Sequence, residues 1–468
     1  MKRDWKQEHR RRGPVMTPDA LRQLAANVLG MTRSDVASVS LDHKAIRVRR
    51  IAHGTVQLTN DGDTLLLVFH TRFGSRREVL LSINQLDEAT LRKAVQYTER
   101  LAHEQFGDPM MTPESLPISP RTYPPNTCTY HGTVAAMSDV SDDIVPALLD
   151  PIASAGLDGA AFVGSMVHST AYANKQGLLA TGEETDSEVT VTCWEPTNED
   201  GSRLRGWAGQ SARDWATLEP GRVSQEAVRL ARLADRTVAL EPGRRLTILG
   251  APAVAQIVRA MGRDFDAYAT LAGYTPLSSI KRYGKVVDER VTLSSDPNDR
   301  EGGYLPFDTR GYPRIAMEWI RHGNLMNLAY ETDFAAVSGV APANSFPESL
   351  RLAGGTTSLN EMIANCKEGV YVNRLEDIEV VHGRSGLMSG VTSGGCFLIK
   401  NGKIEKAVKD FRFLDSPYLF LNRIEAVGPT ARRSFGFSPW HGAWPIAPTI
   451  VPPVMVRDFN FNGLAENA

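Results

Sequence analysis

The sequence predicts an α+β fold, in which N-terminal α/β units with antiparallel sheets are followed by a large β-rich C-terminal domain. Up to about residue 239, amphipathic helical segments alternate with β-rich runs. Beyond that point, short strand-like runs are separated by many turns that contain glycine or proline. The 39 glycines and 27 prolines among 468 residues also argue against a coiled coil or an all-helical array.

The first ordered element is predicted to be a helix over residues 17–30. Thr17 suits the N-cap, Pro18 the first helical position and Gly30 the C-terminal stop. Strands are expected around residues 45–50, 55–59, 64–72 and 77–83, and Asp87 is expected to begin a helix that runs to about residue 103. The sequence Asn60-Asp61-Gly62 lies between two of these strands and predicts a hairpin turn there.

The chain is predicted to divide into five regions. These are a disordered basic tail at 1–16, an α/β domain at 17–107, a Pro-rich linker at 108–127, a middle α/β domain at 128–239 and a β-rich domain at 240–468. The middle region shows helix-like stretches near 141–155 and 225–235 and strands near 158–172 and 188–195.

Charge and cysteine content narrow the class of protein. With 52 Lys and Arg against 54 Asp and Glu, the net charge is −2, which is not the balance of a nucleic-acid-binding protein. Four cysteines cannot form a disulfide scaffold, which favours a reducing compartment. No apolar run approaches the roughly 20 residues that span a bilayer, and the basic N-terminus lacks the apolar segment of a secretory signal. We therefore expect a cytoplasmic protein with no membrane or nucleic-acid partner.

The search for a metal site or a phosphate site gives largely negative results. No two of the ten histidines lie within five residues of each other, so a helical zinc site with two histidines is absent. Cys128 and His131 have ligand spacing but form an isolated pair, and no phosphate-binding glycine loop is present. An acidic loop at 296–301 is expected to be an ordinary solvated turn.

A cysteine nucleophile is a further possibility that the sequence leaves open. Cys396 follows two glycines, and His382 lies upstream as a potential base. The alternative interpretation, which we favour, is that Cys396 is a small apolar residue within a strand.

Several segments, taken in their order along the chain, resemble the TldD/PmbA (TldE) family over about residues 18–430. These segments are ALEPGRRLTILGAPAVAQIVRAM, GGTTSLNEMIANCKEGVYVNRLE and VTSGGCFLIKNGKIEKAVKDFRF, preceded by the strand-like NKQGLLAT. TldD-type members of this family carry H-E-x-x-x-H and a late cysteine that bind zinc, with the glutamate as base. TldE/PmbA-type members lack these residues and pair with a TldD-type subunit.

The resemblance places this chain in the TldE/PmbA group. It puts Arg259, Ala260 and Asp264 at the positions of the His, Glu and His of the zinc motif, within about one residue of register. No histidine occurs between His168 and His322, and no cysteine follows Cys396. An arginine stays protonated and repels a cation, so it cannot replace an imidazole ligand. The resemblance therefore implies no catalytic residue and no metal ligand in this chain, with zinc bound by the partner.

The implied function is that of a metal-free subunit in a heterodimeric zinc metallopeptidase that degrades or processes unfolded or precursor peptides. Such a subunit would form half of a peptide chamber, and the candidate lining or peptide-binding residues are Arg259, Arg263, Asp264, Ser393, Gly394 and Gly395. An arginine in that chamber could hold a peptide carboxylate. The alternatives are a homodimeric peptide-binding or scaffolding protein without peptidase activity, and a stand-alone hydrolase that depends on Cys396. The Trp- and Pro-rich stretch 434–453 has no assigned role.

Overall fold

The computed structural model describes residues 16–73, 79–104, 119–124, 128–136, 144–195, 204–234, 236–340, 347–429, 432–438 and 444–465. The predicted α+β class is confirmed: antiparallel sheets occupy the N-terminal half, and a large β-rich region follows. Nearly all of the predicted basic tail and most of the predicted Pro-rich linker lie outside the described residues.

One six-stranded antiparallel sheet dominates the N-terminal half, and we call it the N-terminal sheet. Its order is β3-β2-β1-β4-β5-β6. The strands are β1 (Val36–Ala52), β2 (Thr55–Arg72), β3 (Val79–Ile83), β4 (Asp158–Asn174), β5 (Leu179–Trp194) and β6 (Arg205–Ala212). Because β1 pairs with β4 along its length, the ranges 17–107 and 128–239 share this single sheet.

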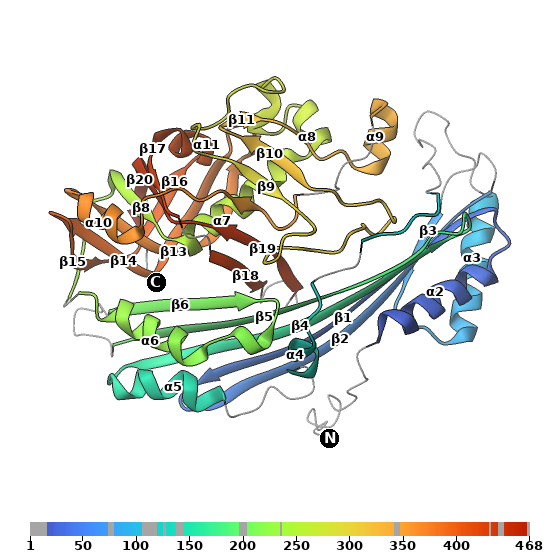
Figure 1. The fold of residues 1–468 in the computed structure, drawn as a ribbon, viewed down its shortest axis with the longest axis horizontal. Helices are drawn as coiled ribbons and strands as arrows, with labels where there is room; N and C mark the ends of the chain where they lie inside the picture. Colours follow the sequence, from blue (N-terminus) through green and yellow to red (C-terminus); the bar gives the residue numbers. More distant parts are fainter. Residues whose placement is uncertain are drawn as a thin grey trace.

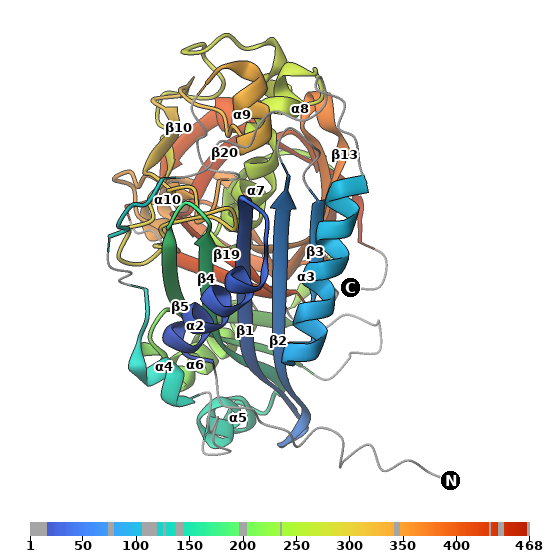
Figure 2. The ribbon, with the colours of Figure 1, turned by 90° about the vertical axis from the view of Figure 1, so that its right-hand side faces the viewer.

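Helices cover one face of the N-terminal sheet (Figures 1 and 2). They are α2 (Pro18–Met31), α3 (Glu88–Glu104), α4 (His131–Ala136), α5 (Ile144–Ser154) and α6 (Pro220–Ala231), with a short turn η1 (Trp215–Thr217). The predicted cap of the first helix forms, since Thr17 accepts a hydrogen bond from the Ala20 amide at 3.3 Å. The other face of the sheet looks toward the C-terminal domain.

The predicted hairpin turn at Asn60-Asp61-Gly62 is wrong. This segment lies inside β2, and the β1–β2 turn is at His53-Gly54, where both residues have positive φ (49° and 77°) as a two-residue hairpin turn requires. The acidic residues at 61 and 63 are held in the strand by arginines of β1. The ion pairs are Arg49–Asp61 at 2.6 Å and Arg47–Asp63 at 3.3 Å.

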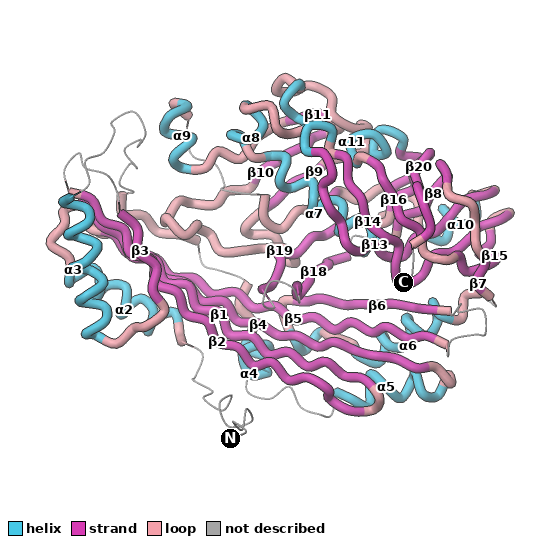
Figure 3. Tube along the Cα trace, turned by 180° about the vertical axis from the view of Figure 1, so that it is seen from behind, coloured by secondary structure: helices cyan, strands magenta, loops and turns pink. Residues whose placement is uncertain are grey.

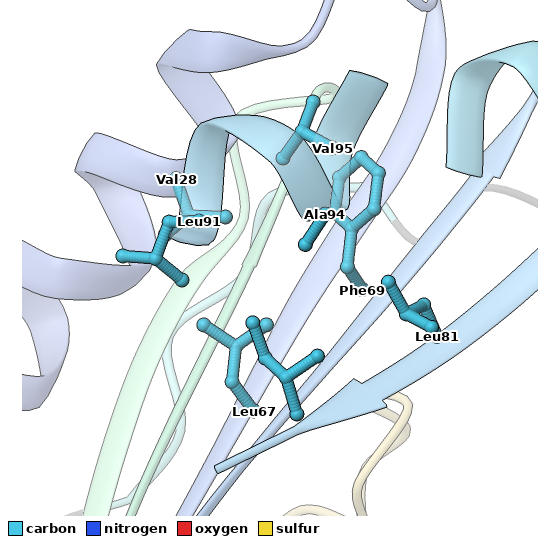
Figure 4. A pocket seen from close by; sticks show the side chains of 8 residues that line it. Val28, Leu67, Phe69, Leu81, Leu91, Ala94 and Val95 are labelled. Carbon is cyan, nitrogen blue, oxygen red and sulfur yellow. The ribbon is translucent and has the colours of Figure 1, made fainter. Parts of the chain in front are cut away.

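A narrow apolar seam separates α3 from strands β2 and β3 (Figure 4). Its lining consists of Val28, Leu67, Phe69, Leu81, Ile83, Leu91, Ala94 and Val95. All the described residues that line it are apolar, so we interpret it as part of the N-terminal core and not as a ligand site.

The C-terminal domain contains a closed five-stranded barrel. Neighbouring strands follow the order β13-β8-β20-β16-β14, and β14 pairs again with β13, which closes the ring. The strands are β8 (Gly243–Leu249), β13 (Glu368–His382), β14 (Leu387–Lys400), β16 (Phe411–Asp415) and β20 (Val454–Leu464). Phenylalanines of β16 and β20 stack within its core, for example Phe411 and Phe461 with ring centroids 4.4 Å apart.

Smaller elements surround the barrel (Figure 3). A second C-terminal sheet has the order β11-β10-β9-β12-β19-β18, while β7, β15 and β17 extend the barrel sheet. The strands of this second sheet are β9 (Leu293–Ser295), β10 (Met317–Arg321), β11 (Asn324–Leu325), β12 (Arg351–Leu352), β18 (Arg432–Ser438) and β19 (Trp444–Val451). The strands that extend the barrel sheet are β7 (Thr237–Val238), β15 (Lys403–Val408) and β17 (Ile424–Val427). The helices are α7 (Ala251–Met261), α8 (Ala267–Leu271), α9 (Thr332–Ser338), α10 (Leu359–Asn365) and α11 (Pro417–Phe420), with turns η2 (Gly262–Phe265), η3 (Pro276–Ser279), η4 (Gly383–Ser385) and η5 (Leu421–Arg423).

Candidate functional site

Charged side chains gather where the uncovered face of the N-terminal sheet meets the C-terminal domain. Side chains of a strand alternate between its two faces, so in β5 every second residue points toward this contact. We call the group the joint cluster, and its members are Asp42, His168, Glu184, Asp186, Arg213 and Arg433.

His168 lies between two carboxylates of neighbouring strands. Its Nε2 is 2.8 Å from Asp42 Oδ2 and its Nδ1 is 2.9 Å from Glu184 Oε1. Burial alone would lower the pKa of His168, but the two carboxylates outweigh it and raise the pKa to about 9. Burial would raise the pKa of each carboxylate, yet the imidazolium, aided by Lys44 and Arg213, lowers both to about 2. His168 is therefore a buried cation at neutral pH.

Asp186 is the centre of the other half of the joint cluster. Its Oδ2 accepts a hydrogen bond from Arg213 at 2.7 Å, and its Oδ1 accepts one from Arg433 of β18. Arg213 also binds the Gly303 carbonyl, and Arg433 binds the Glu301 carbonyl at 2.8 Å. The loop that contains residues 301–303 is thus fastened to the N-terminal sheet.

The charges of the joint cluster balance, with three carboxylates facing three cations. The Asp42 and Glu184 carboxylates have strongly lowered pKa values, which makes them weak bases near neutral pH. This arrangement joins the N-terminal sheet to the C-terminal domain.

A second contact between the domains forms at the bend of β14. Gly394 and Gly395 have positive φ (63° and 124°), and a Cβ on Gly394 would lie 2.4 Å from the Cβ of Trp207 in β6. Asn373 bridges the contact, since its Nδ2 donates to the carbonyls of Trp207 and Gly394, each at 2.9 Å. In this structure Trp207 lies against Gly394, so this residue contacts the N-terminal sheet, and the peptide-binding role of Ser393, Gly394 and Gly395 stays a prediction.

The three predicted residues around α7 have different surroundings. Arg263 is exposed, whereas Asp264 is 8% exposed and accepts a hydrogen bond from Tyr418 at 2.8 Å. Burial raises the pKa of Asp264 to about 6, although the Tyr418 hydrogen bond acts against it. Arg259 lies in the last turn of α7 and reaches toward β18. Arg259 is partly exposed, and the peptide-binding role of all three residues stays a prediction.

The strand register argues against the hydrolase alternative in which His382 is the base for Cys396. Cys396 is opposite Val372 in the β13–β14 ladder, while His382 is opposite Leu387. The nine residue steps of β14 from Leu387 to Cys396 correspond to roughly 30 Å of extended strand, so the two residues lie far apart along the ladder. Burial, with a smaller contribution from Asp410, raises the pKa of the Cys396 thiol well above its ordinary value. His382 instead hydrogen-bonds Ser385 at 2.9 Å.

The residues of the described chain do not fit a zinc ion. Within that part of the chain, no three His, Cys, Asp or Glu side chains lie together in a way that could hold a metal. The side chain of His131 is not among those described, so the Cys128–His131 pair lies outside this statement. In the acidic loop, Asp299 accepts hydrogen bonds on both oxygens from Arg351 of β12, at 2.6 and 2.9 Å, so its charge is compensated by a neighbouring strand.

The sequence analysis missed the joint cluster. Its members come from residues 42, 168, 184, 186, 213 and 433, and they meet only through strand pairing and domain contact. One signal was available, because β5 carries Glu184, Asp186 and Glu188 at every second position. Alternation of that kind indicates one polar face that a folded protein must compensate.

Comparisons with known proteins agree with this architecture. Residues 242–463 match the PmbA/TldA metallopeptidase C-terminal domain. TldE from Thermococcus kodakarensis has the same fold, with a TM-score of 0.78, 16% identity and coverage of 94% of this chain and 99% of that one.

Two curated relatives are named metalloproteases. The protein of Methanothermobacter thermautotrophicus is 23% identical over 294 residues, and that of Archaeoglobus fulgidus is 25% identical over 214 residues. The matches cover 58% and 42% of this chain and only 62% and 48% of those proteins. No helix in the described ranges is both long enough and apolar enough to cross a membrane. The C-terminal domain of this chain is thus similar to the C-terminal domain of the PmbA/TldA metallopeptidases.

Proposed function

We propose that this chain is the metal-free, TldE-like subunit of a two-subunit zinc metallopeptidase that degrades or processes unfolded or precursor peptides. The observation that carries the proposal is the composition of α7, where the family resemblance aligns Arg259, Ala260 and Asp264 with the zinc motif of TldD-type members. The guanidinium of Arg259 and the buried, Tyr-bound Asp264 cannot form a zinc site together. Zinc and the water-activating glutamate are then functions of the partner.

In this proposal the chain forms one side of a peptide chamber in the cytoplasm. The part of the N-terminal sheet formed by β2 and β3 carries exposed leucines on its uncovered face, with Leu66 43% and Leu80 53% exposed. In this proposal these leucines meet another molecule. The outer strands β3, β11 and β18 also have edges, on which an extended peptide can add by main-chain hydrogen bonds.

Co-expression with a TldD-type subunit tests the proposal. We expect the two chains to co-purify as a heterodimer, and we expect metal analysis to find about one zinc per heterodimer, all of it on the partner. Unfolded peptides should be cleaved by the complex but not by this chain alone. The matched control is a partner variant that lacks its motif glutamate, which should assemble and bind zinc without cleaving.

Two outcomes would contradict the proposal. One is about one tightly bound zinc on this chain alone, with activity that is lost on chelation. The other is a stable homodimer that binds peptides and never captures the partner, which would favour the scaffolding alternative.

A further inference from the structure

Two arginines of the chain bind carboxylates in the same two-pronged geometry. The Nε and Nη2 atoms together face the two oxygens, at 2.6 and 2.9 Å in Arg351–Asp299 and at 2.7 and 2.8 Å in Arg229–Glu226. This edge of the guanidinium matches the spacing of a carboxylate and gives directional, charge-assisted hydrogen bonds.

At Arg259 the same edge has no carboxylate partner among the described residues. The Nε atom is buried without a hydrogen-bond partner, and Nη2 reaches only the Ser434 carbonyl, at a long 3.4 Å. The remaining nitrogen, Nη1, is 3.5 Å from the neutral amide of Gln256. Burial lowers the pKa of Arg259 to about 10 despite the charge of Glu188, so the side chain remains a cation at neutral pH.

Neighbouring buried arginines differ from Arg259 in this respect. Arg213 and Arg433 both bind Asp186. Arg374 pairs with Glu376 at 2.5 Å and lies 4.5 Å from the ring centre of Trp207. A largely buried cation without a hydrogen-bonded carboxylate is costly, even with the charge of Glu188 nearby, and an incoming carboxylate would relieve that cost.

We propose that Arg259 binds the carboxylate of an extended peptide, either its C-terminal carboxylate or an acidic side chain. This inference rests on the proposed function and adds a substrate class to it. The location fits because Arg259 is partly exposed and approaches β18, an edge strand beside which an extended chain can lie. One oxygen of the peptide carboxylate accepts a hydrogen bond from Nη2 in place of the Ser434 carbonyl, and the other oxygen accepts one from Nε. Arg259 is thus a binding residue with no part in bond cleavage.

Peptide-binding measurements on the intact chain test this directly. The probes are a fluorescent unstructured peptide with a C-terminal amide, the same peptide with a free carboxylate, and an amide peptide with one internal glutamate. By fluorescence anisotropy, we expect at least one of the two acidic peptides to bind about tenfold more tightly than the neutral amide. Whichever acidic peptide gains affinity identifies the source of the carboxylate.

Two variants make the result specific. Arg259→Gln should remove the preference for the carboxylate while neutral-peptide affinity stays within about twofold. Arg222→Gln is the control, since it removes an exposed arginine of α6 that has no proposed binding role, and it should keep the full preference. Thermal unfolding reports whether each variant folds, and the acid-to-amide comparison in the unmodified chain requires no variant.

Three results would overturn the inference: equal affinity for acidic and neutral peptides, a preference that survives Arg259→Gln, or no binding of any probe. The proposed function has a separate readout. If the heterodimer cleaves acidic and neutral peptides with the same KM, the subunit assignment stands and the role of Arg259 fails.

Discussion

The stability that His168 contributes to the protein depends on pH, and its two carboxylate neighbours determine the direction of this dependence. Its folded pKa of about 9 lies above the ordinary 6.5, so its contribution to stability is complete below about pH 6.5 and is lost as the pH rises through 9. The carboxylates of Asp42 and Glu184 act in the opposite sense. Their contribution is present above about pH 4.5 and is lost as the pH falls toward 2.

Replacing His168 with glutamine should therefore destabilise the protein most at mildly acidic pH. The variant leaves two carboxylates partly buried without their cation, which should cost roughly 3 kcal/mol. The measurement is the thermal midpoint of both proteins from pH 6 to pH 10. The gap should be widest near pH 6 and should narrow toward pH 10, where the native histidine is neutral. A gap that does not change with pH would mean that His168 acts by packing alone.

The cysteines provide a second prediction at this scale. All four are buried, and burial raises the pKa of Cys193 to about 11 and that of Cys396 well above its ordinary value. Thiols in that state react slowly with alkylating agents because the thiolate is the nucleophile. Intact mass spectrometry after iodoacetamide treatment at pH 8 should show an unmodified native chain and four additions in urea. Rapid modification of Cys396 in the native chain would contradict this prediction and would support a role for Cys396 as a nucleophile.

At the level of elements, strand β14 depends on two glycines with positive φ. It turns at Gly394 and Gly395, and the approach of Trp207 leaves no room for a Cβ on Gly394. Gly394→Ala should lower the free energy of unfolding by roughly 2–4 kcal/mol, because it combines a steric clash with a strained φ. Gly30→Ala in α2 is the control, since a Cβ there meets nothing within 4 Å and alanine favours a helix. Thermal midpoints of the two variants should move in opposite directions, and a well-folded Gly394→Ala protein of unchanged stability would contradict the packing described here.

Local signals account for the elements that the sequence predicts well. The first helix, the helix from residue 88 and α7 all have apolar spacing and start signals that the surrounding fold does not override. The hairpin turn was misplaced because Asp61 and Asp63 are stabilised by Arg49 and Arg47 of the paired strand, which turn propensity ignores. The joint cluster depends on register between strands more than 100 residues apart, and a single sequence does not encode that register visibly.

For the whole molecule, the joint cluster decides whether the two halves stay together. Asp186→Asn leaves the guanidinium groups of Arg213 and Arg433 facing each other without the carboxylate that joins them, which should cost roughly 3 kcal/mol. We expect a larger radius of gyration in solution X-ray scattering and a lower thermal midpoint. Glu226→Gln, which removes an exposed helical ion pair, is the control and should change neither quantity. An unchanged, compact Asp186→Asn protein would show that packing at Trp207 suffices.

The ring of the C-terminal barrel also sets the order in which a growing chain can fold. All strands of the N-terminal sheet have been synthesised once residue 212 has been added. Strand β8 of the barrel, in contrast, can pair with β20 only after synthesis reaches Leu464. At translation rates of about 5–20 residues per second, the roughly 250 intervening residues take about 10–50 s. During that time the charged face of the N-terminal sheet is in water and the edges of β8 and β16 are unpaired, which exposes the nascent chain to aggregation. Ribosome-bound chains arrested before Val454 should accordingly bind chaperones strongly, and release of the last strand should end that binding.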